Sequence, residues 1–540
     1  MSMALRKPAR QATARIKTYA APVKGWNARD QVDQIDDLEA ARLDNFFPRP
    51  NKVELRRGIE VFSRAVDAPV ETIMEFSSQA TRKMVVAGNG KIYSVSDAGV
   101  GTSLASGFTE DRYSWLMFKE YLLTFNGAET PQKYDGTTWA ANSFSGSGLT
   151  QANLVAATAH RTRLLAWEAA KPWFWYGGTD SISGTLTKFD LAKEGVRGGN
   201  LVAIASWTRD SGNGTDDLAV FFMSQGEAIV YKGSNPGDAD NWSKVGVFPV
   251  AAPISRHAII KLAGDVVYVS KDGILSLETV LPLGGTKRYA ALSDKISGAF
   301  LEAVTDYDSN AGWQLIHYPR GPMLVCNVPV AMADTGQPET YQLVMNTDTG
   351  AWAKFTGLNL RCLGMYADEL YAGGETEGAV WDEGIWDVSA WASGLIVKID
   401  SGAADIDIDS NGNVATADIV GRLTTKHFGM GADTLKKRFT MVRPVLESGG
   451  ALSYQLALSC DYDPREPSWT DPTVIEAAGA AWDTGVWDVA EWGADTVVHS
   501  VWRSAGGLGY SAALEMRVTT SSQSVSLRSF GFMFEPGGVL

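Results

Sequence analysis

The residues with the clearest potential for chemistry form a run of oxygen-bearing side chains between residues 407 and 418. They fall at positions 1, 3, 5, 6, 7 and 12 of a calcium-binding loop: Asp407, Asp409, Asn411, Gly412, Asn413 and Asp418. Calcium prefers oxygen ligands, and the glycine allows the sharp turn that such a loop makes. An Asp replaces the usual bidentate Glu, however, and the flanking residues are typical of strands. The segment therefore predicts either a calcium site or an acidic hairpin that holds no ion.

The sequence carries none of the motifs of the familiar enzyme classes. There is no GxSxG elbow, no GxxxxGK[ST] loop and no GxGxxG after a predicted strand. The five histidines form no HExxH spacing, and Cys326, Cys362 and Cys460 form no CxxC pair. We expect no catalytic residues and no cofactor, and we expect the cysteines to be small buried apolar side chains in a reducing compartment.

Residues 51–392 consist of short apolar runs separated by turn residues. Met84–Ala87, Tyr121–Phe125 and Met323–Cys326 are examples of the runs. Asn126-Gly127 and Asp135-Gly136 are typical of hairpin turns, because Asn-Gly and Asp-Gly adopt the required positive φ angles. The runs group into units of about 45 residues, the size of a four-stranded blade. This pattern predicts an all-β fold with a β-propeller of six or seven blades, and a set of β-sandwiches is the alternative.

Tryptophan marks two further features of the chain. Trp139, Trp242 and Trp352 each follow an acidic turn closely, as an aromatic residue does where it covers the edge of a blade. The segments WDEGIWDVSAW (residues 381–391) and WDTGVWDVAEW (residues 482–492) form an internal repeat. Their five-residue tryptophan spacing fits neither a strand nor a helix face, so we expect consecutive tight turns with packed indoles.

The two ends of the chain differ from its middle. Residues 393–540 alternate apolar and polar side chains in longer runs, which predicts a C-terminal β-sandwich-like domain. Residues 1–50 predict an extended arm that is first basic and then acidic. The arm is either a frayed terminus or a segment that crosses onto a neighbouring subunit. Its basic residues are candidates for the subunit interface: Arg6, Lys7, Arg10, Arg15 and Lys17.

Charge limits the partners that the chain can have. Its 540 residues carry a net charge of −14, and because residues 1–26 contribute +6, the remainder carries −20. Such a body argues against an ordinary basic nucleic-acid-binding surface. We expect no membrane insertion and no export leader, because no apolar run reaches the length of a membrane helix and no charged-then-apolar segment begins the chain.

Several stretches resemble tail nozzle proteins of short-tailed bacteriophages. They are Asn45-Phe-Phe-Pro48, Lys133-Tyr-Asp-Gly-Thr-Thr-Trp139, Phe222-Met-Ser-Gln-Gly-Glu-Ala-Ile-Val-Tyr-Lys-Gly233, Val267-Tyr-Val-Ser-Lys-Asp-Gly-Ile-Leu-Ser-Leu277 and Met345-Asn-Thr-Asp-Thr-Gly-Ala-Trp-Ala-Lys-Phe355. The resemblance covers about residues 20–445 and consists of turn and strand signatures. It implies a structural virion protein of the tail, assembled in the host cytoplasm, that extends the DNA channel and takes part in genome retention and ejection.

The resemblance also implies the partners of the chain. They are further copies of itself in a hexameric ring, the adaptor or head-to-tail connector of the phage, and tail fibre or tailspike proteins. Genomic DNA would pass without sequence-specific binding, because a negatively charged body repels the duplex. Two alternatives remain: a receptor-binding or glycan-cleaving tail appendage, and a cellular propeller scaffold.

Overall fold

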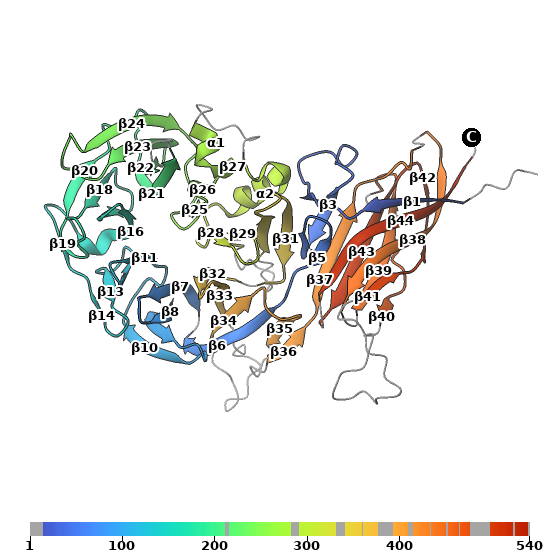
Figure 1. The fold of residues 1–540 in the computed structure, drawn as a ribbon, viewed down its shortest axis with the longest axis horizontal. Helices are drawn as coiled ribbons and strands as arrows, with labels where there is room; N and C mark the ends of the chain where they lie inside the picture. Colours follow the sequence, from blue (N-terminus) through green and yellow to red (C-terminus); the bar gives the residue numbers. More distant parts are fainter. Residues whose placement is uncertain are drawn as a thin grey trace, which may run out of the picture.

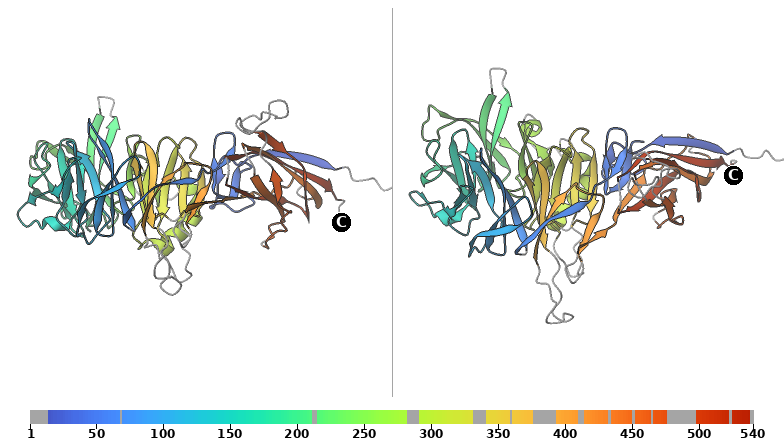
Figure 2. Two further views of the ribbon diagram at one scale, coloured as in Figure 1. Left: turned by 90° about the horizontal axis from the view of Figure 1, so that it is seen from below. Right: turned by 60° about the horizontal axis from the view of Figure 1, so that its bottom comes forward.

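The computed structural model describes residues 14–67, 69–210, 215–281, 291–330, 341–358, 360–375, 393–408, 414–431, 434–449, 452–463, 465–475, 497–521 and 524–537. Two bodies lie side by side along the longest axis, a ring of blades and a β-sandwich (Figure 1). Seen from its side, the ring is one blade deep, and the sandwich extends it lengthwise (Figure 2). The fold is all-β, as the sequence predicted.

The ring is a β-propeller, and the described residues form seven blades. Six blades have four strands each, and the fifth has three. The first four blades are β7 (Val70–Ser77), β8 (Arg82–Gly88), β9 (Lys91–Val95) and β10 (Gly101–Ser106); β11 (Ser114–Phe118), β12 (Tyr121–Phe125), β13 (Gln132–Tyr134) and β14 (Trp139–Ala141); β16 (Leu154–His160), β17 (Arg163–Glu168), β18 (Trp173–Tyr176) and β20 (Thr187–Asp190); β21 (Leu201–Asp210), β22 (Thr215–Met223), β23 (Glu227–Gly233) and β24 (Trp242–Pro249). The fifth is β25 (Ile259–Leu262), β26 (Asp265–Ser270) and β27 (Gly273–Ser276), the sixth is β28 (Gln314–Tyr318), β29 (Met323–Val328), β30 (Tyr341–Asn346) and β31 (Trp352–Thr356), and the seventh is β32 (Cys362–Tyr366), β33 (Glu369–Glu375), β34 (Ser393–Ile399) and β6 (Ile59–Asp67).

The last blade closes the ring by joining distant parts of the sequence. β6 precedes all the other propeller strands, yet it pairs with β34 in the seventh blade. This pairing fastens the start of the propeller sequence to its end and so holds the ring closed, while β6 itself forms the outer edge of the seventh blade. The propeller therefore runs past the predicted boundary at residue 392, since β34 extends to Ile399.

The turn chemistry of the sequence explains the outer strands. Trp139, Trp242 and Trp352 are the first residues of β14, β24 and β31, each the fourth strand of its blade. In the turn before β14, the carboxylate of Asp135 accepts hydrogen bonds from the backbone N–H groups of Thr137 (2.8 Å) and Thr138 (2.7 Å). Trp139 and Trp242 thus begin edge strands, as predicted, whereas Trp352 does not, because β31 pairs onward with β2 (Gly25–Trp26).

The sandwich takes strands from both ends of the chain. One sheet contains β4 (Phe46–Pro48), β5 (Val53–Leu55), β44 (Val525–Pro536), β38 (Lys437–Ser448), β41 (Val497–Ser500), β42 (Arg503–Gly509) and β1 (Arg15–Ala20). The facing sheet contains β2 (Gly25–Trp26), β3 (Glu39–Asp44), β37 (Ile419–Thr425), β43 (Ala512–Thr520), β39 (Leu452–Cys460) and β40 (Thr473–Ile475). Residues 15–55 are therefore built into the sandwich, and the predicted division between a separate arm (residues 1–50) and a C-terminal domain does not hold.

The propeller and the sandwich share a sheet and a core. β2 pairs with β31 of the sixth blade and with β3 of the sandwich, so one ten-stranded sheet runs from blade to sandwich. One hydrophobic cluster contains Val344 of the blade together with Phe46 and Phe532 of the sandwich. Burial of apolar surface across the joint holds the two bodies together.

The remaining elements are short. Besides α1 (Leu277–Val280) and two small pairs, β15 (Phe144–Ser145) with β19 (Gly184–Thr185) and β35 (Asp405–Ile408) with β36 (Val414–Ala417), the structure has a helix α2 (Ser297–Tyr307) that buries Phe300, Ala303 and Val304. The sequence analysis did not predict α2. Among the described residues, no helix has the length and apolar character needed to cross a membrane.

Candidate functional site

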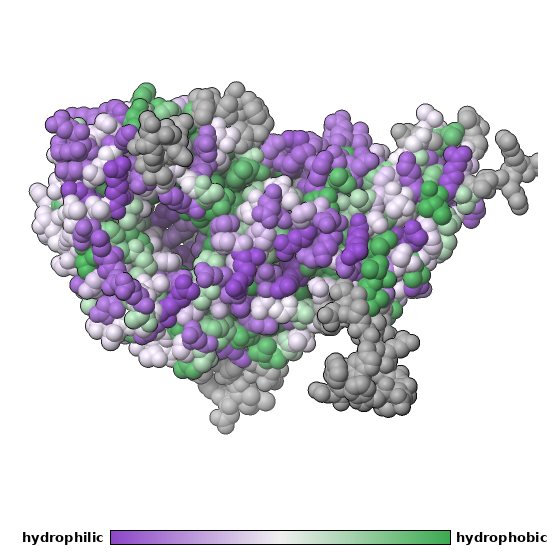
Figure 3. Space-filling view, viewed as in Figure 1, coloured by the Kyte–Doolittle hydropathy of each residue, from purple (hydrophilic) through white to green (hydrophobic). Residues whose placement is uncertain are grey.

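The innermost strands of the seven blades surround a central channel. These strands are β7, β11, β16, β21, β25, β28 and β32, and residues of all seven line a cavity of about 660 Å³. A hollow with hydrophilic walls is visible over the middle of the propeller (Figure 3). The channel wall carries five cationic side chains, Arg112, Arg161, Arg256, Lys261 and Arg361, against the two carboxylates of Glu71 and Asp217. The net negative charge of the chain is therefore not spread evenly, because the channel is basic.

Two of the arginines share one carboxylate. Arg112 Nε donates to Glu71 Oε2 at 2.8 Å, and Arg361 Nη1 donates to Glu71 Oε1 at 2.8 Å. Arg112 stands just before β11 and Arg361 just before β32, while Glu71 lies on β7 between these strands in the ring. The single carboxylate of Glu71 cannot neutralise two guanidinium groups, so one net positive charge remains.

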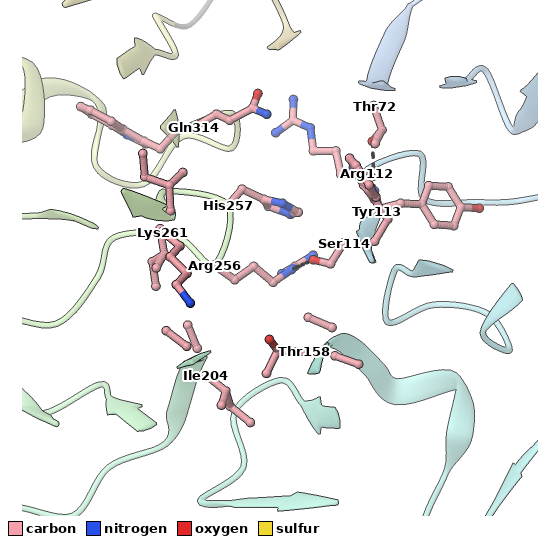
Figure 4. A pocket seen from close by; sticks show the side chains of 18 of the residues that line it. Thr72, Arg112, Tyr113, Ser114, Thr158, Ile204, Arg256, His257, Lys261 and Gln314 are labelled. Atoms are coloured by element: carbon pink, nitrogen blue, oxygen red, sulfur yellow. Dashed lines mark hydrogen bonds between the residues drawn. The ribbon is translucent and has the colours of Figure 1, made fainter. Parts of the chain in front are cut away.

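The loop before β25 sends two further side chains toward the channel. Arg256 and His257 reach into the cavity toward Ser114, which lies on the opposite side of the view (Figure 4). Arg256 Nε donates to Ser114 Oγ at 3.1 Å. Burial lowers the pKa of Arg256, and the negative charge of Glu110 opposes that effect. Burial also lowers the pKa of His257 to about 3, helped by the positive charges of Arg256 and Arg112, so His257 is neutral at pH 7.

Lys261 completes the basic wall from β25. Its Nζ donates to Thr208 Oγ1, and Thr208 in turn donates to Asp217 Oδ1 at 2.8 Å. The sequence analysis did not find this channel. Arg112 and Arg361 each lie within two residues of the start of an inner strand. Aligning the blades on their inner strands would have brought these arginines together.

The sandwich presents a different kind of surface. Half of the large hydrophobic side chains that the described residues expose lie on it: Ile16, Tyr462, Val474, Val498, Val501, Leu508 and Tyr510. Several hydrophobic side chains are visible on the sandwich at the end away from the propeller (Figure 3). Within the described part of the chain, the strands β1, β40, β41 and β42 each pair with a single neighbour, so they are sheet edges. Exposed apolar groups beside open edges are typical of protein–protein contacts.

The predicted interface arm is only partly described. Arg15 and Lys17 lie on β1, which pairs with β44 of the same chain and is largely exposed. Tyr19 anchors this strand, because its ring centroid lies 3.9 Å from that of Phe428. The frayed terminus considered above is therefore excluded for residues 15–20. Arg6, Lys7 and Arg10 lie outside the described residues.

The acidic run that follows the arm has partners in its own chain. Asp36 pairs with Lys24 (2.8 Å), Asp37 with Lys426 (2.7 Å) and Glu39 with Lys295 (2.9 Å). The hydrogen bond from Lys24 holds the pKa of Asp36 below its ordinary value. These contacts tie residues 24–39 to the sandwich and to the propeller.

Only two of the five predicted calcium ligands, Asp407 and Asp418, lie within the described residues. Asp407 lies on β35 and Asp418 just after β36, and β35 and β36 pair as a hairpin. Asp409, Asn411 and Asn413 lie outside the described residues, so the calcium site stays a prediction. In the described part of the chain, no group of three or more His, Cys, Asp or Glu residues is arranged to hold a metal ion. The two tryptophan repeats, residues 381–391 and 482–492, also lie outside it.

The three cysteines are free thiols. Cys326 and Cys362 are buried, as predicted, and Cys460 is half-buried. Burial raises the pKa of the Cys326 and Cys362 thiols to about 12 and that of Cys460 to about 11. These thiols stay protonated and unreactive at neutral pH.

Comparison with known proteins adds little to the fold. No protein-family model matches the chain, and no curated protein matches it. Among solved structures, the computationally designed protein Ika8 is 10 % identical over 69 % of this chain and 99 % of its own, with a TM-score of 0.34. An exo-β-1,3-galactanase from Phanerochaete chrysosporium is 9 % identical over 83 % and 100 %, with a TM-score of 0.26. BBS1N, solved in complex with ARL6DN, is 10 % identical over 65 % and 98 %, with a TM-score of 0.35. Likenesses this distant carry no argument about function.

Proposed function

We propose that the chain is a structural subunit of a short-tailed bacteriophage tail, a nozzle protein that assembles into a ring below the portal and adaptor and extends the DNA channel. The sequence resemblance suggests the family, and the propeller joined to a sandwich is compatible with it. The observation that carries the proposal is the sandwich surface, where open sheet edges and exposed apolar side chains occur together. A ring of identical subunits needs such a head-to-tail contact.

The edge strand β42 offers the sharpest place to test this contact. Leu508 is 61 % exposed on β42, which among the described residues pairs with β38 alone. A large apolar side chain on an open edge is stabilised when another subunit covers it. In the proposed ring, Leu508 would lie against the neighbouring copy.

The experiment measures the mass of the purified chain in solution by light scattering, followed by imaging of the particles. We expect a closed ring of about six copies of the 58.1 kDa chain with an axial hole. The variant Leu508→Asp places a charge in the contact and should yield single folded chains at the same concentration.

Val196→Asp is the matched control. Val196 is 87 % exposed on the propeller, before β21, and lies far from the sandwich edges in sequence and in the fold. This variant should assemble like the unmodified chain. Single chains in every unmodified sample would contradict the proposal, and so would rings that persist in Leu508→Asp. Incubation of the same sample with host surface glycans tests the alternative, a glycan-binding or glycan-cleaving appendage.

A further inference from the structure

The propeller channel holds a cluster of cationic and polar donors that the proposed role in a ring does not use. Arg256 forms one hydrogen bond, from Nε to Ser114, and in the described part of the chain it has no carboxylate in salt-bridge contact. Its terminal nitrogens are left for another acceptor. Ser114 accepts that bond through its oxygen, so its own hydroxyl proton is also available. Figure 4 shows both groups at the cavity.

Two neighbouring nitrogen atoms lack a hydrogen-bond partner among the described residues. They are Arg112 Nη1 and His257 Nε2, both enclosed by protein. An enclosed polar group without a partner is unfavourable, because it has lost its hydrogen bonds to water and gained none in the protein. Arg112, Arg256 and His257 all line this cavity (Figure 4). An acceptor that reaches them would remove part of this cost.

The charges that face this cluster favour an anion. Glu71 is shared between Arg112 and Arg361, which leaves one positive charge over, and Arg256 adds a second. The negative charge of Glu110 acts on Arg256, but the two side chains form no salt bridge. On the β25 side, the positive charge of Lys261 faces the negative charge of Asp217, and Thr208 forms hydrogen bonds to both side chains. Cations held in a partly desolvated site attract a negative group more strongly than they would in water.

The dimensions of the cavity indicate the class of ligand. A volume of about 660 Å³ lies within the range of sites that hold small organic molecules, and it is larger than a lone inorganic ion requires. The wall also offers apolar surface, since Trp115 lines it and is 36 % exposed. A small organic molecule could place its anionic group on the arginines and its remaining surface against this indole.

We propose that the channel of the propeller binds a small organic molecule through an oxyanion group, a phosphate monoester or a carboxylate, that is held by Arg256 with Arg112, Ser114 and His257. Arginine presents two parallel N–H groups to such an anion, and this geometry favours bidentate binding. Neutral His257 contributes a hydrogen bond rather than a charge. The site lies inside a single chain, so it does not depend on the proposed ring.

Isothermal titration calorimetry on the full chain tests this site with four probes: inorganic phosphate, glucose 6-phosphate, glucuronate and neutral glucose. We expect glucose 6-phosphate or glucuronate to bind and glucose not to bind. The affinities for these two anions show whether the site prefers the phosphate monoester of glucose 6-phosphate or the carboxylate of glucuronate. Binding of glucose alone, or of none of the probes, would overturn the proposal.

Variants assign the binding to the channel. Arg256→Gln should lower the affinity for the anion at least tenfold. Arg256→Lys should lower the affinity less, because the positive charge remains. Arg197→Gln is the matched control, since Arg197 is exposed outside the channel and donates to the carbonyl of Gly226. Equal affinities for Arg256→Gln and the unmodified chain would overturn the proposal.

A measurement on the unmodified chain covers the case in which Arg256→Gln does not fold. Phenylglyoxal modifies accessible arginines, and mass spectrometry locates the modified residues. The bound anion should protect Arg256 and leave Arg197 unprotected. Equal labelling of Arg256 with and without the anion would count against the site.

Discussion

The propeller and the sandwich are built from the same kind of strand, yet they place different side chains at their accessible surfaces. The propeller closes on itself through β6, and its cluster of cationic side chains, which includes Arg112, Arg256 and Arg361, lines the channel. The sandwich leaves β1, β40, β41 and β42 as edges and exposes apolar side chains beside them. A closed ring is suited to hold a small ligand inside it, whereas an open sandwich is suited to contact another chain.

A buried polar network joins these two regions. Arg56 donates to Asp405 through Nη1 (2.8 Å) and Nη2 (2.5 Å), and its side chain is only 3 % exposed. Arg56 also donates to Asn45 Oδ1 at 2.9 Å and to the carbonyl of Thr356 in the sixth blade at 3.2 Å. The side chain of Asn45 in turn donates to the carbonyl of Val420 in the sandwich at 2.9 Å. The joint is therefore specified by polar contacts as well as by the shared core.

Of the changes that test the joint between propeller and sandwich, removal of one charge of this network should lower the free energy of unfolding most. Asp405→Asn keeps the shape of the side chain but leaves the buried Arg56 without a carboxylate, and we expect the free energy of unfolding to fall by about 3–5 kcal/mol. Urea unfolding followed by tryptophan fluorescence measures the change. Because the network touches both regions, the whole chain should be destabilised rather than the sandwich alone.

Asp463→Asn serves as the control for this variant. Asp463 pairs with Arg465 at 2.6 Å, but that arginine side chain is 86 % exposed. An exposed pair is screened by solvent and contributes little to stability, so this variant should behave nearly as the unmodified chain does. Similar losses in both variants would show that Arg56 and Asp405 are not a special joint.

The second prediction concerns the backbone of the same joint. Gly25 on β2 has a φ of +82°, and a Cβ there would lie 2.6 Å from the carbonyl oxygen of Trp352 on β31. Gly25→Ala should therefore cost about 1–3 kcal/mol in unfolding free energy, from both backbone strain and the clash. Gly148 has the same φ of +82° but open space around its Cα.

Gly148→Ala therefore measures the backbone strain alone. The difference between the two variants gives the cost of forcing β2 away from the blade. A larger loss in Gly148→Ala than in Gly25→Ala would contradict the close approach of the sandwich to the sixth blade.

The sequence predicted the local elements well and the joints between them poorly. Predicted strands such as Met84–Ala87 and Tyr121–Phe125 lie within β8 and β12, because a short apolar run between Gly or Asn turns is a local signal. The pairing of β6 with β34 and of β1 with β44 joins residues more than 300 positions apart, and no local pattern indicates it. For this reason the predicted domain boundaries at residues 50 and 392 were misplaced.

The same argument explains why the channel was missed. Arg112, Arg256 and Arg361 are single residues in three different blades, and they become neighbours only when the ring closes. The sequence analysis instead selected residues that are close in sequence, such as Asp407 and Asp418. In a propeller, residues that share a blade edge are close in sequence, while residues that share the channel are not.

The third prediction compares one buried histidine from each region. Burial lowers the pKa of His257 in the propeller to about 3, and burial lowers that of His427 in the sandwich to about 4, opposed by Asp461. The unfolded chain takes up a proton on histidine near pH 6.5, whereas the folded chain resists it. The contribution of each histidine to the free energy of unfolding is therefore fully present above pH 6.5. As the pH falls from 6.5 toward the folded pKa, that free energy falls by up to about 1.4 kcal/mol per pH unit for each histidine.

Unfolding free energies measured from pH 7 down to pH 4 separate the two contributions. His257→Gln should flatten the loss of stability over the whole of this range, because the folded pKa of His257 lies below it. His427→Gln should flatten it as strongly near pH 6 but less near pH 4, where folded His427 itself begins to take up its proton. A slope unchanged by His257→Gln would mean that the channel is open enough to hydrate a charged histidine, and the low-dielectric site assigned to the propeller would then be wrong.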